Sequence, residues 1–385
     1  MKILFFSYSD NQGGAAKAAF TIFKAIKSNN FIKCDFLCIH KKFKESIKLV
    51  NNFNFFYLFL LRIIEKFIIF FFKTKFHQSL NIFNSLNLSK INKINYDIIN
   101  FHWINRCSIS LNEILKIKKK IMISLHDMWF LNGSSHYFYK NTNTILDKYI
   151  FFLKKKIYLK DNIYFIAHTK WMYRNALKLI KKEKVFLCKY YPIDTELFRP
   201  RNKEILKKKF NIQTKKKIIL FSAQNINDPR KGQLYFYKLL KYFSLKKKFY
   251  FIIVGKGTLD EKYKQFNNIS HFSFLERKKM AEVYALSDIY VCTSIIDNLP
   301  LTVLEAMSSG LVVVAFDSGG IKEVLGKSGY IIYKKNYIKI IKILNQLSDK
   351  LIFNKSRIAR DFALKNFSYE KFKDSYIKII NKIYT

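Results

Sequence analysis

At 385 residues the chain is longer than a single hydrophobic core usually supports, so we expect two domains. Half of its residues are hydrophobic, which excludes an intrinsically disordered protein. The formal net charge of +43 has two explanations that both stay open: a basic field that attracts phosphates or anionic lipid, and the Lys-, Ile- and Asn-rich composition of an AT-rich coding sequence.

Several motifs that are typical of other classes of protein are missing from the sequence. The lysines are spread through the chain without zinc-finger spacing, a basic zipper or an aromatic RNA-binding motif, so we expect no nucleic-acid partner. The five cysteines form no C-x-x-C pair, which argues against a disulfide framework and a structural zinc site. Because no signal-peptide pattern precedes the first predicted strand, we expect a cytoplasmic protein with reduced thiols.

The first third of the chain alternates short apolar runs with amphipathic stretches, which predicts parallel strands joined by crossover helices. Gly13 and Gly14 lie between the first strand and a helical stretch, where the backbone can approach a ligand and helix amides can bind an anion; a tight structural turn explains them equally well. The predicted strands cover residues 3–7, 34–39, 98–103 and 121–125.

The segment 53–76 is unusually apolar. Its central run has the length of a transmembrane span, but it contains Arg62, Glu65 and Lys66. The apolar residues favour insertion by roughly 6 kcal/mol and the charges oppose it by roughly 8 kcal/mol, so we expect no span. Two alternatives remain for its apolar face: packing in the N-terminal core, or lying in the interface of an anionic membrane, which would make the protein peripheral on the inner face of the cell membrane.

The strand pattern resumes after a lysine-rich interval and predicts a second doubly wound unit, with strands over 218–222, 249–254, 289–293 and 312–316. The Pro-containing stretch 191–200 is the predicted linker, and the tail 369–384 is predicted to be helical. We therefore expect an α/β protein with two Rossmann-like, doubly wound domains, covering 1–195 and 196–365, and a C-terminal helix in 366–385.

The most informative stretch is 294–323. It places Asp297 in a loop after a predicted strand, opens a helix near Leu301, and continues with Glu305 and Gly310. A loop at the carboxyl end of a parallel strand is where open α/β sheets bind ligands. Carboxylates accept hydrogen bonds from sugar hydroxyls, and the amides of a helix N-terminus bind phosphates. The pattern predicts a site for a sugar joined to a diphosphate.

This stretch resembles the signature of retaining family 4 glycosyltransferases of the GT-B fold, in which an acidic residue, seven residues and a Glu are followed by Ala-Met and a Gly. The resemblance implies two facing Rossmann-like domains with an interdomain cleft, and a C-terminal helix that packs back on the N-terminal domain. Here Asp297 stands where most relatives have the longer Glu.

Other segments follow the family order. Arg230 and Lys231 resemble its basic clamp on the donor phosphates. His126, at the end of the strand 121–125, resembles the residue that reaches the donor sugar. The surrounding tract, with His102 and His136 as candidate acceptor-side residues, resembles a subgroup that builds exopolysaccharide or lipopolysaccharide sugars.

The resemblance implies a hexosyltransferase that moves a sugar from a UDP- or GDP-linked donor to a glycan or lipid-linked acceptor with retention of configuration. It implies that Glu305 holds the ribose, Asp297 orients the sugar and His126 contacts it from the other domain. No D-x-D triplet occurs, so we expect neither a metal nor a cofactor. The donor-binding residues expected are Gly13, Gly14, Arg230, Lys231, Leu301, Thr302 and Glu305.

Two alternative functions remain open. A non-catalytic basic protein would bind anionic membrane or nucleic acid with steep salt dependence and without regard to Glu305. A sugar-nucleotide epimerase of the same fold would turn over its substrate without an acceptor.

Overall fold

The computed structural model describes residues 1–48, 52–71, 78–83, 94–137 and 144–385. The chain forms two compact units. The N-terminal unit comprises Met1–Tyr191 together with Phe372–Thr385, and the C-terminal unit comprises Pro192–Lys371. The boundaries expected from the sequence lay after residues 195 and 365.

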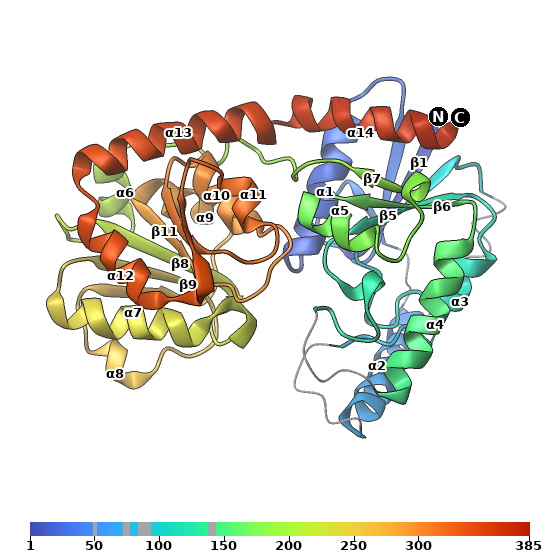
Figure 1. The fold of residues 1–385 in the computed structure, drawn as a ribbon, viewed down its shortest axis with the longest axis horizontal. Helices are drawn as coiled ribbons and strands as arrows, with labels where there is room; N and C mark the ends of the chain where they lie inside the picture. The colour runs from blue at the N-terminus through green and yellow to red at the C-terminus, as the bar shows by residue number, and fades with distance from the viewer. Residues whose placement is uncertain (49–51, 72–77, 84–93, 138–143) are drawn as a thin grey trace. The chain divides into compact units, whose positions relative to one another are not determined.

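The N-terminal unit contains a parallel seven-stranded sheet in the order β3-β2-β1-β4-β5-β6-β7 (Figure 1). Its central strands β1, β4 and β5 are buried along almost their whole length, as in a sheet covered on both faces, and residues 3–6 of β1 have no exposed surface. All four strands predicted in this region are present. The strands are β1 (Lys2–Ser9), β2 (Lys33–His40), β3 (Ser46–Lys48), β4 (Ile98–Phe101), β5 (Lys120–Leu125), β6 (Ile163–Ala167) and β7 (Val185–Leu187).

One helix of this unit, α14, belongs to the C-terminal end of the chain. The Asn100 amide of β4 donates a hydrogen bond to the Tyr376 hydroxyl at 2.5 Å, and Tyr376 is fully buried. The helices are α1 (Gly14–Lys27), α2 (Asn52–Phe71), α3 (Leu111–Lys116), η2 (Trp129–Leu131), α4 (Ile145–Leu159), α5 (Lys170–Ala176), η3 (Lys182–Lys184) and α14 (Tyr369–Tyr384), of which the first three residues lie in the C-terminal unit.

The C-terminal unit contains a parallel six-stranded sheet in the order β10-β9-β8-β11-β12-β13. The strands are β8 (Ile218–Asn225), β9 (Tyr250–Lys256), β10 (Ile269–Phe272), β11 (Ile289–Cys292), β12 (Val312–Phe316) and β13 (Tyr330–Ile332). The helices are α6 (Lys203–Lys209), η4 (Pro229–Lys231), α7 (Gln233–Lys246), α8 (Glu261–Lys264), α9 (Arg277–Leu286), α10 (Leu301–Ser308), α11 (Ile321–Leu325), η5 (Tyr333–Lys335), α12 (Tyr337–Gln346) and α13 (Asp349–Phe367).

Both sheets reverse their strand order once. In the N-terminal sheet the reversal lies between β1 and β4, and in the C-terminal sheet between β8 and β11. Loops that leave the carboxyl ends of such neighbours diverge to opposite faces, which opens a crevice for ligands. The candidate residues Gly13 and Gly14 follow β1, His102 follows β4, and Arg230 and Lys231 follow β8. The topology thus places them beside the two reversal points.

Residues 53–71 of the apolar segment lie in helix α2, and residues 72–76 lie outside the described residues. Leu58, Leu61 and Glu65 are buried, and the Glu65 carboxylate accepts hydrogen bonds from the amides of Leu80 and Asn81 at 2.8 and 3.3 Å. The opposite side is exposed, so the core alternative accounts for one side of α2 only. None of the helices in the part of the chain that the structure describes combines the length and the apolarity that a membrane crossing requires.

We expect Arg360→Ala to lower the free energy of unfolding of the C-terminal unit by about 2 kcal/mol, because three backbone carbonyls would lose the hydrogen bonds that they accept from Arg360 Nη1. These are the carbonyls of Thr195, Phe198 and Ser308, at 3.1, 3.0 and 2.7 Å. Urea unfolding measures the change. The exposed Arg357 on the same helix is the control, and Arg357→Ala should stay within about 0.5 kcal/mol. Equal effects would contradict the assignment.

Candidate active site

The candidate donor residues of the C-terminal unit lie on the segments that follow β8 and β11. Strand β8 leads to η4, which Asp228 caps by accepting a hydrogen bond from the Arg230 amide at 2.9 Å. Strand β11 leads to the loop that contains Asp297. The amide of Ile295 donates to the carbonyl of Arg230 at 2.8 Å, so the backbone itself joins the basic and the acidic segment.

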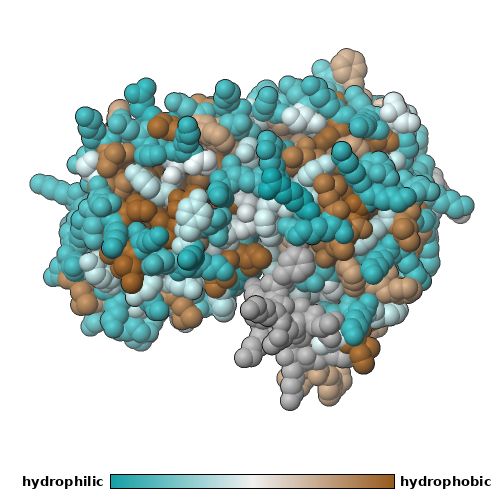
Figure 2. Space-filling view, in the orientation of Figure 1, coloured by the Kyte–Doolittle hydropathy of each residue, from teal (hydrophilic) through white to brown (hydrophobic). Residues whose placement is uncertain are grey.

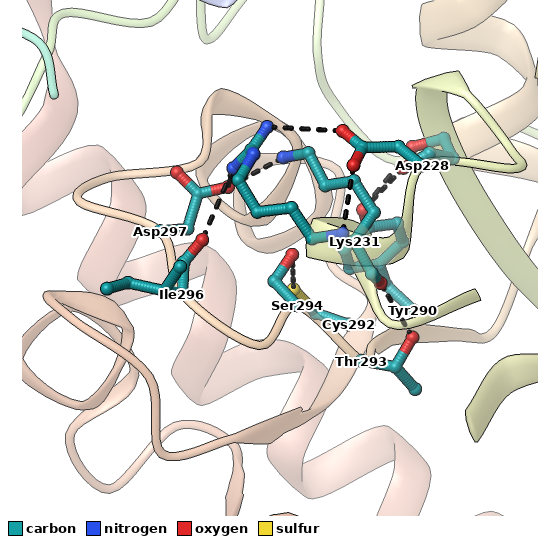
Figure 3. A network of polar contacts seen from close by, with 10 residues as sticks. Asp228, Lys231, Tyr290, Cys292, Thr293, Ser294, Ile296 and Asp297 are labelled. Carbon is teal, nitrogen blue, oxygen red and sulfur yellow. Dashed lines mark hydrogen bonds and ion pairs between the residues drawn. The ribbon is translucent and has the colours of Figure 1, made fainter. Parts of the chain in front are cut away.

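Two cations hold Asp297. Its Oδ2 accepts hydrogen bonds from Lys231 Nζ at 2.6 Å and from Arg230 Nη1 at 3.1 Å, and Figure 3 shows the Lys231 side chain extending toward Asp297. Asp297 is only 7% exposed. Burial by itself raises the pKa of this carboxyl, but Lys231 and Arg230 outweigh burial and lower it. The site therefore holds a buried carboxylate and two paired cations.

Two glycines fix the backbone around this ion cluster. Gly232 has φ +73° and Gly319 has φ +60°, a region that L-residues rarely adopt. A Cβ at Gly232 would lie 1.8 Å from the carbonyl oxygen of Thr293, and one at Gly319 would lie 1.8 Å from that of Asp297. The Asp297 carbonyl also accepts a hydrogen bond from the Gly320 amide at 3.2 Å. Only a residue without a side chain permits these approaches.

Helix α10 opens next to this loop. Pro300 precedes its first turn, which contains Leu301 and Thr302, both partly exposed. Amides in a first turn have no acceptor one turn earlier in the helix, so such a turn presents donors to an anion. Glu305 lies one turn further and is 9% exposed. The helix begins at Leu301, where the sequence predicts it, so its first turn lies between Asp297 and Glu305 along the chain.

A cluster of hydroxyl groups surrounds Glu305. The Tyr284 hydroxyl donates to the Glu305 carboxylate, and Ser222 Oγ lies 3.3 Å from the hydroxyl of Tyr284 and 3.4 Å from that of Tyr290. The Tyr290 hydroxyl also contacts the Thr302 side chain. Burial, reinforced by Glu305, raises the pKa of Tyr284, so its hydroxyl keeps its proton and remains a donor.

In the N-terminal unit the structure brings His126 and His102 together. His102 Nδ1 lies 2.9 Å from His126 Nε2, and His126 Nδ1 lies 2.9 Å from the Tyr191 hydroxyl. Burial lowers the pKa of His102 to about 3, with His168 contributing. Burial, followed by His102 and His168, also lowers the pKa of His126. Both rings are therefore neutral at physiological pH.

The structure gives His136 a separate set of partners. Its Nδ1 lies 2.6 Å from Asp127 Oδ2, and its Nε2 lies 3.0 Å from Ser79 Oγ and 3.3 Å from Asn105 Nδ2. His136 is 6% exposed. The serine, histidine and aspartate resemble a hydrolytic triad in order, but Ser79 is 1% exposed and hence inaccessible to a substrate in this conformation. This network fixes the segment that follows His126.

Gly13 and Gly14 lie where the sequence predicts, at the start of α1. Gly13 has φ +89° and precedes the helix, and a Cβ at Gly14 would meet nothing within 4 Å. The positive φ explains why position 13 is a glycine. At position 14 a Cβ would meet no other atoms within that distance, so packing does not require a glycine there.

Sequence reasoning missed three side chains that support the candidate residues: Asp228, Tyr284 and Tyr191. The aspartate before η4 had a capping signal, since Asp is a preferred N-cap residue. The two tyrosines carry no local signal, because their partners are distant in sequence. Among the described residues, no group of three or more His, Cys, Asp or Glu side chains is arranged to hold a metal ion.

Residues 202–359 match the model of the family described as glycosyl transferases group 1. The chain is 23% identical over 301 residues to an uncharacterized 41.2 kDa protein in the cps region of Klebsiella pneumoniae, which covers 75% of this chain and 79% of that protein. It is 29% identical over 209 residues to the Escherichia coli UDP-Gal:alpha-D-GlcNAc-diphosphoundecaprenol alpha-1,3-galactosyltransferase, which covers 49% of this chain and 54% of that enzyme.

Solved structures share the fold along nearly the whole chain. A glycosyltransferase from Rickettsia africae ESF-5 matches with a TM-score of 0.67 at 18% identity, over 99% of this chain and 98% of that one. Anabaena HepE in complex with UDP-glucose matches with a TM-score of 0.70 at 14% identity, over 99% of each chain. The predicted GT-B fold is confirmed, and so is the resemblance to group 1 glycosyltransferases read from the acidic loop.

We expect Gly319→Ala to destabilise the C-terminal unit far more than Gly326→Ala. Both glycines have positive φ, which costs an L-residue about 1 to 2 kcal/mol, but a Cβ at Gly326 meets nothing within 4 Å. At Gly319 the backbone of Asp297 has to move as well, which adds about 2 kcal/mol or more. Urea unfolding of the two variants measures the difference. Equal losses would show that the close approach does not constrain the loop.

Proposed function

We propose that this group 1 glycosyltransferase moves a hexose from a nucleotide-sugar donor to a glycan or lipid-linked acceptor with retention of configuration and without a metal ion. The observation that carries the proposal is the ion cluster of Lys231, Arg230 and Asp297 beside the opening turn of α10. That arrangement offers cations and helix amides to a diphosphate and carboxylates to the hydroxyls of a sugar and a ribose.

The charges of the cluster suggest how a donor enters. Asp297 Oδ2 accepts hydrogen bonds from both cations. A nucleoside diphosphate is a stronger acceptor set for Lys231 and Arg230 than one carboxylate oxygen, because it offers several charged oxygens to them. Exchange of partners would release Asp297 to accept hydrogen bonds from the sugar, while the cations stabilise the charge that develops on the departing diphosphate.

The remaining contacts follow from the positions of the carboxylate and amide groups. Glu305, held by Tyr284, would accept hydrogen bonds from the ribose, and the amides of Leu301 and Thr302 would bind diphosphate oxygens. We propose that the side chain of His126, in the N-terminal unit, contacts the donor sugar and that Gly13 is one of the donor-binding residues. UDP-linked donors are the first candidates, because the names of the Escherichia coli relative and of the HepE complex both contain them.

The acceptor is proposed to belong to cell-surface polysaccharide synthesis. One relative is a protein of a cps region, and the name of another specifies a diphosphoundecaprenol acceptor. A lipid-linked acceptor requires access to a membrane surface. We place the protein at the cytoplasmic face of the membrane.

Helix α2 supplies a surface suited to that location. Its exposed side carries large apolar residues that are between 41% and 76% exposed, and such a face on one helix fits the headgroup boundary of a bilayer. Figure 2 shows hydrophobic side chains at the end of the N-terminal unit where Figure 1 places α2. Lys66 is exposed on the same helix. The residues are Phe56, Tyr57, Phe59, Leu60, Ile63, Ile64, Phe67, Phe70 and Phe71.

The donor proposal is tested with a panel of UDP- and GDP-hexoses, an acceptor lipid extract and measurement of nucleotide release and melting temperature. One donor should raise the melting temperature, and Glu305→Gln and Lys231→Met should each lower kcat/KM by about a hundredfold, as expected when about 2.7 kcal/mol of transition-state stabilisation is lost. Lys262→Met, at an exposed lysine of the same unit, is the control.

Other outcomes would identify the alternatives. Conversion of the sugar nucleotide without acceptor would indicate an epimerase. Absence of any donor effect, together with salt-dependent binding of lipid or nucleic acid that Glu305→Gln leaves unchanged, would indicate a non-catalytic basic protein.

The membrane proposal is tested by sedimentation with vesicles of equal parts phosphatidylglycerol and phosphatidylcholine. The double variant Phe67→Ser, Phe70→Ser should bind at least about tenfold more weakly, because each Phe contributes about 1.5 to 3 kcal/mol when buried in an apolar phase. Phe31→Ser removes an 88% exposed Phe from another part of the same unit and should bind like wild type. If the double variant binds as well as the control, α2 does not dock on the membrane.

A further inference from the structure

The chain passes between the two units twice, once leaving and once re-entering the N-terminal unit, and both crossings adjoin one aromatic cluster of that unit. The N-terminal unit ends at Tyr191 and resumes at Phe372. The rings of both residues contact His168, with centroid distances of 4.6 and 6.3 Å. His168 is fully buried, and its Nδ1 lies 3.0 Å from the Cys188 carbonyl. The two connections are thus anchored on the same side chain.

The same cluster contains His126. Its ring lies 5.4 Å from the ring of Tyr191, with an angle of 28° between the planes, and 6.2 Å from the ring of His168. The Tyr191 hydroxyl is 2.9 Å from His126 Nδ1, and His102 takes the other nitrogen. Both ring nitrogens of His126 are therefore paired with groups of the protein.

This pairing controls what His126 can offer a ligand. A neutral imidazole has one donor nitrogen and one acceptor nitrogen, so the two partners together select the tautomer and the plane of the ring. A hydroxyl group of the donor sugar can form a hydrogen bond with a ring nitrogen of His126 only when His102 or Tyr191 gives up its own hydrogen bond to that nitrogen. His102 lies on the segment that follows β4, whereas Tyr191 is the last residue of the N-terminal unit before the chain continues into the C-terminal unit.

The backbone at the crossing is also constrained. Tyr190 has φ +66°, an uncommon conformation for a residue with a side chain, and its amide donates to the His168 carbonyl at 3.0 Å. This conformation sets the direction from which Tyr191 enters the cluster. Tyr191 itself is 3% exposed.

We infer that Tyr191 is a positioning residue for His126, and that it connects this histidine to the segment through which the chain leaves the N-terminal unit. The inference rests on the proposed function for the sugar contact of His126. Tyr191 would hold the ring through Nδ1, and a change in the crossing segment would change the nitrogen that His126 presents.

The variant Tyr191→Phe tests this inference, because it keeps the buried ring and removes the bond to His126. We expect kcat to fall by about tenfold and the KM for the donor to change by less than about twofold, as for loss of orientation without loss of binding. In the background of His126→Asn, Tyr191→Phe should have no further effect, because its partner is already absent. Multiplicative effects of the two substitutions would overturn the inference.

The control for a lost buried hydroxyl is Tyr158→Phe. Tyr158 lies on α4 in the same unit, is 5% exposed and donates to the Phe130 carbonyl. Its effect on kcat should be small and should multiply with that of His126→Asn. A loss equal to that of Tyr191→Phe would show that any buried hydroxyl of this unit has the same influence.

A second readout does not depend on activity. The protein has seven histidines, so selective ¹⁵N-histidine labelling gives few ring signals, and His126→Asn assigns those of His126. Tyr191→Phe should shift the His126 ring nitrogens, and Tyr158→Phe should not. If no sugar nucleotide is turned over, the proposed function fails, while unshifted His126 signals would separately refute the contact with Tyr191.

Discussion

The constraint on which the candidate site depends is the neutralisation of a buried carboxylate by two cations. Asp297 would be costly at its depth without Lys231 and Arg230, because removal of one partner leaves an uncompensated charge in a poorly solvated place. The acidic loop is therefore held close to η4. In the proposed function, the charged oxygens of a diphosphate would take over the two cations from Asp297.

The sheet topology brings these charges together. Because the strand order reverses between β8 and β11, the loops that follow them begin at the same edge of the sheet and end on different sides of it. Gly232 and Gly319 then allow the backbones to approach more closely than any side chain would permit. The N-terminal sheet repeats the construction at β1 and β4, where Gly13 and His102 occupy the corresponding positions.

The two units prepare their candidate groups by opposite electrostatic means. In the C-terminal unit, cations keep Asp297 charged in spite of burial. In the N-terminal unit, burial and neighbouring histidines keep His126 neutral, and hydrogen bonds to His102 and Tyr191 orient it. A charged group suits an exchange of ion partners, whereas a neutral imidazole suits hydrogen bonds to sugar hydroxyls. The first suits the diphosphate of the proposed donor, and the second suits its sugar.

The sequence by itself determined the α/β class, eight of the thirteen strands in the described part of the chain, and the acidic loop with the helix that follows it. Apolar runs, glycines and an Asp, Pro and Glu at fixed spacing are local patterns that can be recognised without a partner. It also led to Arg230 and Lys231, although only their place after a strand separated them from the other lysines. The tertiary structure alone decided that both cations bind Asp297, that Tyr284 supports Glu305, and that Tyr191 holds His126. The physical reason is the distance between these partners along the chain: 67 residues between Arg230 and Asp297, 21 between Tyr284 and Glu305, and 65 between His126 and Tyr191. A hydrogen bond depends on separation in space, which no periodicity along the sequence encodes.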